Sequence, residues 1–261
     1  MILSAPLAID LFCGLGGWSE GLLAEGYNCI GFDIERHVYG DQQYPAQLVL
    51  QDALTLHGSQ FRNAALIVAS PPCQRYSYMA MPWSRGKAQA AEIRADATGE
   101  KLRNLNALFN ACFRIQREAC EAAGRYIPMV VENVKGAQPW VGKEKAHFGS
   151  FYLWGDVGMI GNRVIAGATV FASLSVVPMG GVKAPGNDTF KTTGQPCGKF
   201  TDSRYPSGGV KQPGQSGRAW FADPDVAGHF SSKSNSRKAA SAQIAKIPFG
   251  LAAYIARVFR P

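Results

Sequence analysis

The chain has 261 residues, of which 46% are hydrophobic and 11% aromatic, and it carries a formal net charge of +8. This length suffices for a large buried core, and the composition excludes wholesale disorder. No run of 18 apolar residues is present, and the start lacks the basic region of a secretory signal. We therefore expect a cytoplasmic protein without a membrane span.

The positive charge favours a polyanionic partner such as nucleic acid. It is concentrated in residues 183–238, which hold nine Lys or Arg residues against four Asp residues. The six cysteines contain no CxxC pair, which argues for free thiols in a reducing compartment and against a structural zinc site.

The first half of the chain alternates strand and helix signals. Residues 6–12 (PLAIDLF) predict a strand, and residues 13–26 predict a glycine-rich turn that opens a helix ending at Gly26. Residues 27–34 (YNCIGFDI) and 64–70 (AALIVAS) predict two further strands.

A long helical pattern over residues 90–123 is followed by a strand over residues 126–134 (YIPMVVENV). Strands separated by helices imply an α/β fold with a parallel, doubly wound sheet. The carboxyl ends of its strands meet at one edge, where ligands bind in such sheets.

The amino-acid composition changes after about residue 155, and the alternation of strand and helix signals ends there. Residues 178–217 hold nine glycines and several prolines, which predicts a loop-rich lobe. A helical segment over residues 236–259 closes the chain, with a kink or break at Pro248.

The first glycine-rich turn, DLFCGLGG, predicts a site for a nucleoside cofactor. Gly14, Gly16 and Gly17 follow the first strand, where glycines let a ligand approach the backbone closely. The spacing is GxGG and lacks the third glycine of the dinucleotide fingerprint. Asp33 ends the second strand, where a carboxylate can accept hydrogen bonds from both ribose hydroxyls. Asp52 is placed to accept one from an adenine amino group.

The segment SPPCQ places Cys73 on a stiff turn just beyond the strand over residues 64–70. A cysteine nucleophile and a carboxylic acid together suit chemistry at C5 of cytosine. Thiolate attack at C6 makes C5 nucleophilic, and a hydrogen bond or proton at N3 drains the developing charge. Glu132, followed by Asn133, ends a later strand and can meet Cys73 at the same sheet edge.

These motifs resemble the DNA cytosine-5 methyltransferases, in particular the compact phage-type members. DLFCGLGG is similar to their S-adenosylmethionine loop, SPPCQ to their nucleophile motif and VVENV to their glutamate motif, in the same order. The resemblance implies a Rossmann-like S-adenosylmethionine-dependent sheet, with Cys73 as the nucleophile at C6 and Glu132 as the partner of N3.

The resemblance also implies which residues bind the cofactor, S-adenosyl-L-methionine. They come from the first predicted strand and its glycine loop, the end of the second predicted strand, the segment LQDAL and the proline pair: Asp10, Phe12, Gly14, Leu15, Gly16, Gly17, Asp33, Ile34, Asp52, Ala53 and Pro72.

Double-stranded DNA is the implied partner, with its target cytosine flipped out of the stack. Its expected contacts are Gln74, Ser77, Asn133, Arg163, Lys233, Arg237 and Lys238. Residues 1–155 and 231–261 would form the catalytic domain, and residues 156–230 the target-recognition region. We expect a monomer in a bacterial or phage-infected cell, serving either restriction-modification or phage self-protection.

Two departures from the family pattern leave alternatives open. The Gln-x-Arg-x-Arg block has no clean match, and Ala245 and Lys246 replace a Gly-Asn pair that borders the cofactor. The lysine leaves room for a modified sulfonium donor. An RNA cytosine-5 methyltransferase or a non-catalytic DNA-binding relative would share the fold.

Overall fold

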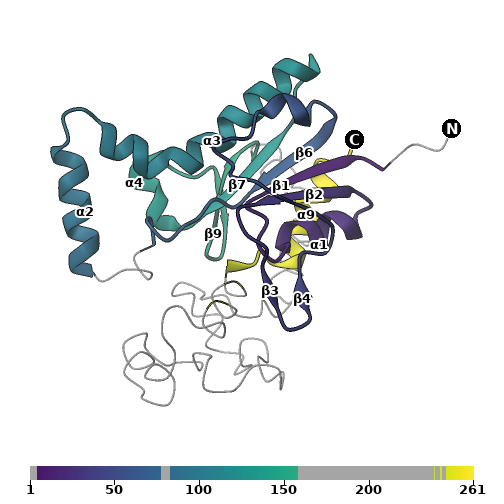
Figure 1. Ribbon diagram of the computed structural model, residues 1–261, viewed down its shortest axis with the longest axis horizontal. Coiled ribbons are helices and arrows are strands. Elements are labelled where there is room, and N and C mark those ends of the chain that lie inside the picture. The colour runs from purple at the N-terminus through teal and green to yellow at the C-terminus, as the bar shows by residue number, and fades with distance from the viewer. Residues whose placement is uncertain (1–4, 78–82, 158–237, 239–241, 243–244) are drawn as a thin grey trace.

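The computed structural model describes residues 5–77, 83–157, 238, 242 and 245–261 (Figure 1). Its centre is a seven-stranded sheet with strand order β5-β2-β1-β6-β7-β9-β8. Five neighbouring strands run parallel: β5 (Gln47–Leu50), β2 (Asn28–Asp33), β1 (Leu7–Leu11), β6 (Ala64–Ala69) and β7 (Met129–Asn133). The predicted α/β fold with a mostly parallel sheet is therefore confirmed.

The far edge of the sheet departs from the parallel pattern. β9 (Phe151–Gly155) pairs antiparallel with β7, and β8 (Ala146–Phe148) pairs antiparallel with β9. The sequence did not predict these strands. Two residues, with Gly149 at φ 60°, suffice to join β8 to β9, whereas a parallel pair needs a long crossover. A separate hairpin consists of β3 (Val38–Tyr39) and β4 (Gln42–Gln43).

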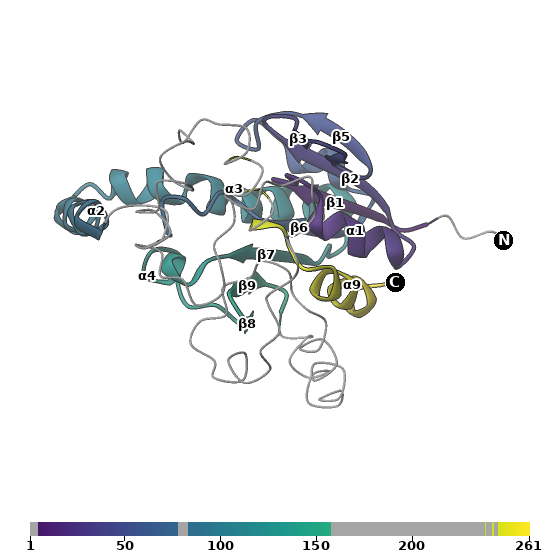
Figure 2. The same cartoon turned by 90° about the horizontal axis from the view of Figure 1, so that it is seen from below.

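Helices cover both faces of the sheet (Figure 2). α1 (Gly17–Ala24) and α9 (Phe249–Val258) pack on one face, with Trp18, Leu22 and Ile255 in a cluster that includes Val68 and Val130. α3 (Glu100–Ala123) and the 3₁₀ helix η1 (Gly58–Phe61) pack on the other face. The helical spacing of Leu105, Phe109, Cys112 and Ile115 accounts for the buried side of α3.

The helical pattern over residues 90–123 corresponds to two helices. α2 (Trp83–Ala95) ends before a turn at residues 96–99, and α3 begins at Glu100. The Asp96 carboxylate accepts hydrogen bonds from the backbone amides of Thr98 and Lys101, at 3.0 and 2.7 Å. Gly99 adopts a positive φ of 67°. Local caps of this kind compete with a continuous helix.

The break predicted at Pro248 is confirmed. Pro248 has an extended backbone and directly precedes α9, as expected for a residue without an N–H to donate. Two short helices, η2 (Lys135–Ala137) and α4 (Gln138–Val141), follow β7. None of the described helices is long and apolar enough to cross a membrane.

Candidate active site

The candidate site lies where the order of the sheet reverses. The chain proceeds outward from β1 to β2 and β5, and then returns to place β6 on the other side of β1. Loops that leave β1 and β6 at their carboxyl ends diverge at such a switch point and leave a crevice for a ligand. The glycine loop follows β1, and the Cys73 loop follows β6.

The glycine loop has an unusual backbone. Phe12 has φ 59° and is the one non-glycine residue with positive φ among the described residues. Such a conformation is costly outside glycine and concentrates at functional sites. Gly14 also has positive φ, and its N–H donates to the Asp33 carboxylate at 2.9 Å. This contact joins the ends of β1 and β2.

Close packing explains two of the glycines. A Cβ at Gly16 would lie 2.3 Å from Pro45 Cδ, and one at Gly17 would lie 2.5 Å from the Ile247 backbone nitrogen. A Cβ at Gly14, in contrast, would meet nothing within 4 Å. The loop is therefore pressed against protein at Gly16 and Gly17 and faces open space at Gly14.

Asp10, at the end of β1, is a buried carboxyl group with an unsatisfied oxygen. Its Oδ2 accepts from Ser19 Oγ at 2.7 Å, and Ser19 Oγ also lies 2.6 Å from the Tyr44 hydroxyl. Its Oδ1 is buried without a hydrogen-bond partner. Burial raises the pKa of Asp10 to about 7, with Asp33 as a lesser cause. A cationic group such as the ammonium of S-adenosylmethionine would satisfy Oδ1.

Asp33 is held in the ionised form. Burial acts to raise its pKa, but hydrogen bonds from His37 and from the backbone of Gly14 and Glu35 outweigh burial and lower it. His37 Nε2 lies 3.5 Å from Asp33 Oδ1, and this contact raises the pKa of His37. An ionised carboxylate suits the predicted role of accepting from ribose hydroxyls.

The remaining residues predicted to bind the cofactor include both exposed and buried side chains. Ile34 is 73% exposed and Pro72 is also exposed, whereas Leu15 and Ala53 are buried. Asp52 Oδ1 accepts from the Leu54 backbone N–H at 2.9 Å, which is the turn contact usual for aspartate. Leu50 and Leu54 are exposed beside it. The roles of these residues toward the cofactor stay predictions.

The Cys73 loop is tied to α3. The backbone amides of Tyr76 and Ser77 both donate to the Cys73 carbonyl, each at 2.9 Å, and form a tight turn. The buried Tyr76 hydroxyl lies 3.1 Å from the Leu105 carbonyl and 2.9 Å from Asn106 Oδ1. These contacts hold the half-buried Cys73 at the edge of the sheet.

Glu132 lies at the corresponding end of β7 and is buried. Burial raises its pKa to about 8, opposed by a hydrogen bond with Ser70. Burial also raises the pKa of Cys73 to about 11, and the nearby charge of Glu132 is the second cause. At neutral pH the pair is therefore largely a neutral acid beside a neutral thiol.

Asn133 is placed differently from expectation. Its side chain is 1% exposed, its Nδ2 donates to the Pro71 carbonyl at 2.9 Å, and its Oδ1 accepts from the Val134 amide. A contact with DNA would require this side chain to leave its partners. In the free protein, Asn133 holds the base of the Cys73 loop.

The other predicted DNA contacts are only partly described. Gln74 and Lys238 are exposed and Ser77 is half-buried, which is compatible with a role at the surface. Arg163, Lys233 and Arg237 lie outside the described residues. So does the predicted recognition region, except Asp156 and Val157.

Lys246 has a partner within the protein. Its Nζ contacts Glu20 Oε1 at 2.5 Å, and its side chain lies against Gly17. This ion pair gives the lysine in the block that usually carries Gly-Asn a structural partner.

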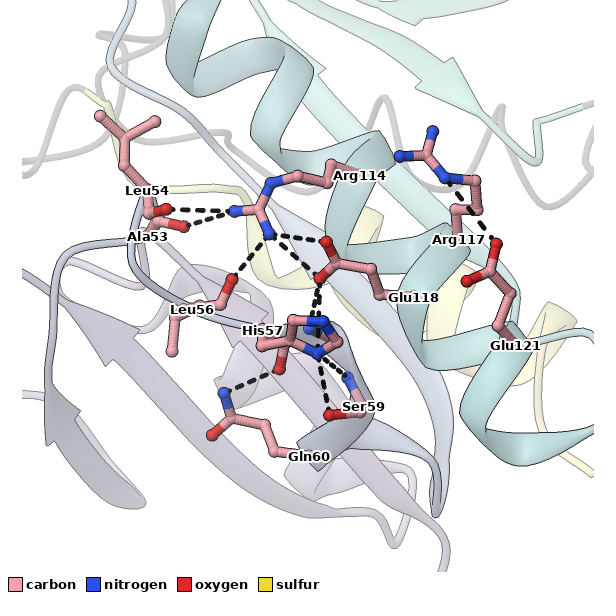
Figure 3. A network of polar contacts seen from close by, with 11 residues as sticks. Ala53, Leu54, Leu56, His57, Ser59, Gln60, Arg114, Arg117, Glu118 and Glu121 are labelled. Atoms are coloured by element: carbon pink, nitrogen blue, oxygen red, sulfur yellow. Dashed lines mark hydrogen bonds and ion pairs between the residues drawn. The ribbon is translucent and has the colours of Figure 1, made fainter.

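Sequence reasoning missed two groups that support the site. Trp18 Nε1 donates to Ser70 Oγ at 2.9 Å, across 52 residues of chain. Arg114 donates to the carbonyls of Ala53, Leu54 and Leu56 and to Glu118, and so clamps the loop after Asp52 onto α3 (Figure 3). A signal for the first contact was Ser70, a polar residue directly after the apolar strand β6, but nothing in the local sequence indicates its distant donor.

A family comparison covers the first third of the chain. Residues 7–93 match the family described as C-5 cytosine-specific DNA methylase. Over this stretch, the chain resembles the cytosine-5 methylases. The match includes the glycine loop, Asp33, Asp52 and Cys73, and it confirms the resemblance predicted from these motifs. Glu132 lies beyond the matched residues. A comparison with curated proteins gives no match.

Several solved structures match part of this chain. A candidate DNA modification methyltransferase encoded within an E. coli prophage is 22% identical, with 51% of this chain and 33% of that chain covered and a TM-score of 0.33. S. pombe Dnmt2 methyltransferase is 15% identical, with coverages of 53% and 37% and a TM-score of 0.32. Entamoeba histolytica EhMeth is 15% identical, with coverages of 53% and 41% and a TM-score of 0.32. The matched part of the chain thus spans well under half of each protein.

Proposed function

We propose that this protein transfers a methyl group from S-adenosylmethionine to C5 of cytosine in double-stranded DNA. The observation that carries the proposal is that Cys73, just after β6, and the buried Glu132 of the neighbouring β7 lie close enough to affect each other's charge, beside the glycine loop. The raised pKa of Glu132, about 8, is what the reaction requires of an acid at N3.

In this proposal Glu132 acts first as a hydrogen-bond donor. A neutral carboxylic acid at pH 7 can donate to N3 of cytosine, whereas a carboxylate would repel the ring nitrogen's lone pair. Delivery of the proton to N3 makes C6 electrophilic. The same proton returns to Glu132 when the ring regains its aromatic character.

Cys73 forms the covalent bond. Its thiol loses a proton to solvent as sulfur bonds to C6, and the electrons of the C5–C6 double bond make C5 nucleophilic. S-adenosylmethionine, when bound, would supply the electrophilic methyl group, which bonds to C5 as its bond to the sulfonium sulfur breaks and leaves S-adenosylhomocysteine. Loss of the C5 proton to solvent then re-forms the double bond and breaks the bond between sulfur and C6.

The cytosine must leave the helix, because its C6 is inaccessible within the base stack. The net charge of +8 supports binding to the phosphate backbone. We assign recognition of the target sequence to residues 156–230, and the catalytic chemistry to the sheet domain.

The test uses duplex DNA in which cytosine carries fluorine at C5. Fluorine does not leave as a proton does, so transfer should stop at a covalent adduct between Cys73 and DNA. Mass spectrometry of the adduct would identify the cysteine, the base and the group transferred. Cys73→Ala should form no adduct, and Cys120→Ala, at another half-buried free thiol, should form it normally.

The outcomes separate the alternatives. An adduct with one added methyl group supports the proposal, and a heavier group identifies a modified donor. An adduct with fluorinated RNA and none with DNA makes the protein an RNA methyltransferase. Binding of DNA without any adduct would leave a non-catalytic relative.

A further inference from the structure

We propose that Ser70, held by Trp18, is a positioning residue that hydrogen-bonds one carboxyl oxygen of Glu132 and thereby leaves the acidic proton on the other oxygen. The catalytic meaning of this role rests on the proposed function. The hydrogen bond between Ser70 and Glu132 follows from the fold alone, so it can be tested in the free protein without measuring catalysis.

The register of the sheet brings Ser70 to Glu132. β6 and β7 pair with Ile67 opposite Met129, Val68 opposite Val130 and Ala69 opposite Val131. The next positions along this register are Ser70 and Glu132, followed by Pro71 and Asn133. The hydrogen bond from Asn133 Nδ2 to the Pro71 carbonyl keeps the two segments side by side beyond the end of β6.

Alternation along the strands places both side chains on one face. Leu66 and Val68 of β6 and Val130 of β7 belong to the core cluster that contains Trp18. Ser70 and Glu132 follow these residues at a spacing of two, so they emerge on the same face as α1. Trp18, in the first turn of α1, is 2% exposed and reaches Ser70 from that side.

The donors and acceptors around Ser70 then determine where its hydroxyl proton points. An indole N–H can only donate, so Ser70 Oγ accepts from Trp18 Nε1 over 2.9 Å. The single hydroxyl proton of Ser70 remains for Glu132, whose pKa is lowered by the Ser70 hydrogen bond. In a neutral carboxylic acid the acceptor is the carbonyl oxygen, so the O–H group lies on the other oxygen and is free to donate elsewhere.

The surroundings of Glu132 let this contact act on its titration. On β9, the residue opposite Glu132 is the apolar Leu153, and on the Cys73 loop the titratable neighbour is Cys73. The pKa of Cys73, about 11, lies well above that of Glu132, so the thiol stays neutral while Glu132 titrates. Loss of the Ser70 hydroxyl would disfavour the ionised form and raise the pKa of Glu132 further.

The experiment follows the Glu132 carboxyl directly in the free protein. Glutamate labelled with ¹³C at the carboxyl carbon gives an infrared or NMR titration, and the signal absent from Glu132→Gln identifies the residue. We expect Ser70→Ala to shift the titration midpoint upward by about one pH unit. Trp18→Phe, which frees the hydroxyl to rotate, should give a smaller shift in the same direction.

Two variants serve as controls. Ser70→Thr keeps a hydroxyl and should retain the native midpoint. Trp154→Phe removes another buried indole N–H, which donates to the Gly142 carbonyl at 3.0 Å. It should lower the stability of the fold without moving the Glu132 midpoint, which separates a local contact from a general loss of packing.

An unchanged midpoint in both Ser70→Ala and Trp18→Phe would overturn the proposal, as would an equal shift in Trp154→Phe. If Ser70→Ala does not fold, the Glu132 midpoints of Trp18→Phe and Ser70→Thr still test the proposal. The fluorocytosine assay is independent: a Ser70-dependent midpoint without any adduct would keep this contact and reject the proposed function.

Discussion

Two buried carboxyl groups, Asp10 and Glu132, share the edge of the sheet and titrate far above their usual range. Burial is the main cause in both, and a serine hydroxyl opposes it in each, Ser19 for Asp10 and Ser70 for Glu132. The two carboxyl groups differ in which atom remains available to a ligand. Asp10 retains an unsatisfied oxygen that suits a cation, and Glu132 retains a proton that suits a ring nitrogen.

Binding of the cofactor product S-adenosylhomocysteine should strengthen as pH rises. Asp10 is neutral below its pKa of about 7 and ionised above it, and only the ionised form attracts the ammonium of the ligand. We expect up to about a tenfold gain in affinity between pH 6 and 8, measured by isothermal titration calorimetry. Asp10→Asn should bind weakly with a flat profile; a native slope in this variant would assign the effect elsewhere, for example to His37.

Methylation should fall steeply as Glu132 loses its proton. With a pKa of about 8, the acid is present at pH 7 and lost above pH 8, so the rate should decline on that alkaline side. Glu132→Gln should reduce the rate of adduct formation by about 10²–10⁴-fold and remove this decline. Adduct formation at the native rate in Glu132→Gln would exclude the acid role.

Cys73→Ser should still bind DNA and lose turnover by several orders of magnitude.

At the scale of elements, α3 supports both loops of the site. Tyr76 ties the Cys73 loop to α3 near its start, and Arg114 holds the loop after Asp52 about two turns later. Gly58 lets η1 approach closely, because a Cβ there would lie 2.0 Å from the Ile115 carbonyl oxygen. Glu118 completes the contact by accepting from the Gly58 N–H at 2.7 Å.

Arg114→Met should loosen the loop that carries Asp52. The variant keeps much of the side-chain volume and removes hydrogen bonds to three carbonyls, so we expect several-fold weaker binding of S-adenosylhomocysteine and a loss of about 1 kcal/mol in unfolding free energy. Arg117→Met is the matched control on the same helix (Figure 3), because among the described residues Arg117 forms an exposed 3.9 Å pair with Glu121 and no other polar side-chain contact. Equal effects of the two variants would contradict the clamp.

At the scale of the molecule, α1 near the start of the chain packs against α9 near its end. A Cβ at Gly21 would lie 2.4 Å from the Ala253 backbone nitrogen, so the two helices touch at their backbones. Tyr27 adds a hydrogen bond to the Ala256 carbonyl across 229 residues. The C-terminal helix therefore supports α1, which begins at the glycine loop and carries Trp18.

Gly21→Leu should separate these helices. Overpacking at this contact should cost about 2–3 kcal/mol of unfolding free energy, measured by chemical denaturation. It should also weaken cofactor binding, because Gly17 and Lys246 lie at the same junction. Ala24→Leu, at an exposed position of α1, is the control and should leave both quantities unchanged. A Gly21→Leu variant with native stability would show that the helices have room to separate.

The sequence by itself determined the main strands and the residues at their ends. Apolar runs predicted β1, β2, β6 and β7, and strand-terminal motifs placed Asp33, Cys73 and Glu132, because local patterns of polarity and turn residues are readable without contacts. It also predicted the break at Pro248, whose missing N–H acts locally.

Only the tertiary structure decided what depends on distant residues. The antiparallel edge, the burial of Asn133, the Arg114 clamp and the Trp18–Ser70–Glu132 contacts join segments tens of residues apart. The raised pKa of Glu132 likewise follows from burial, which no local pattern specifies. Sequence patterns report the chemistry that each residue can perform, whereas packing sets the protonation state and direction of each group.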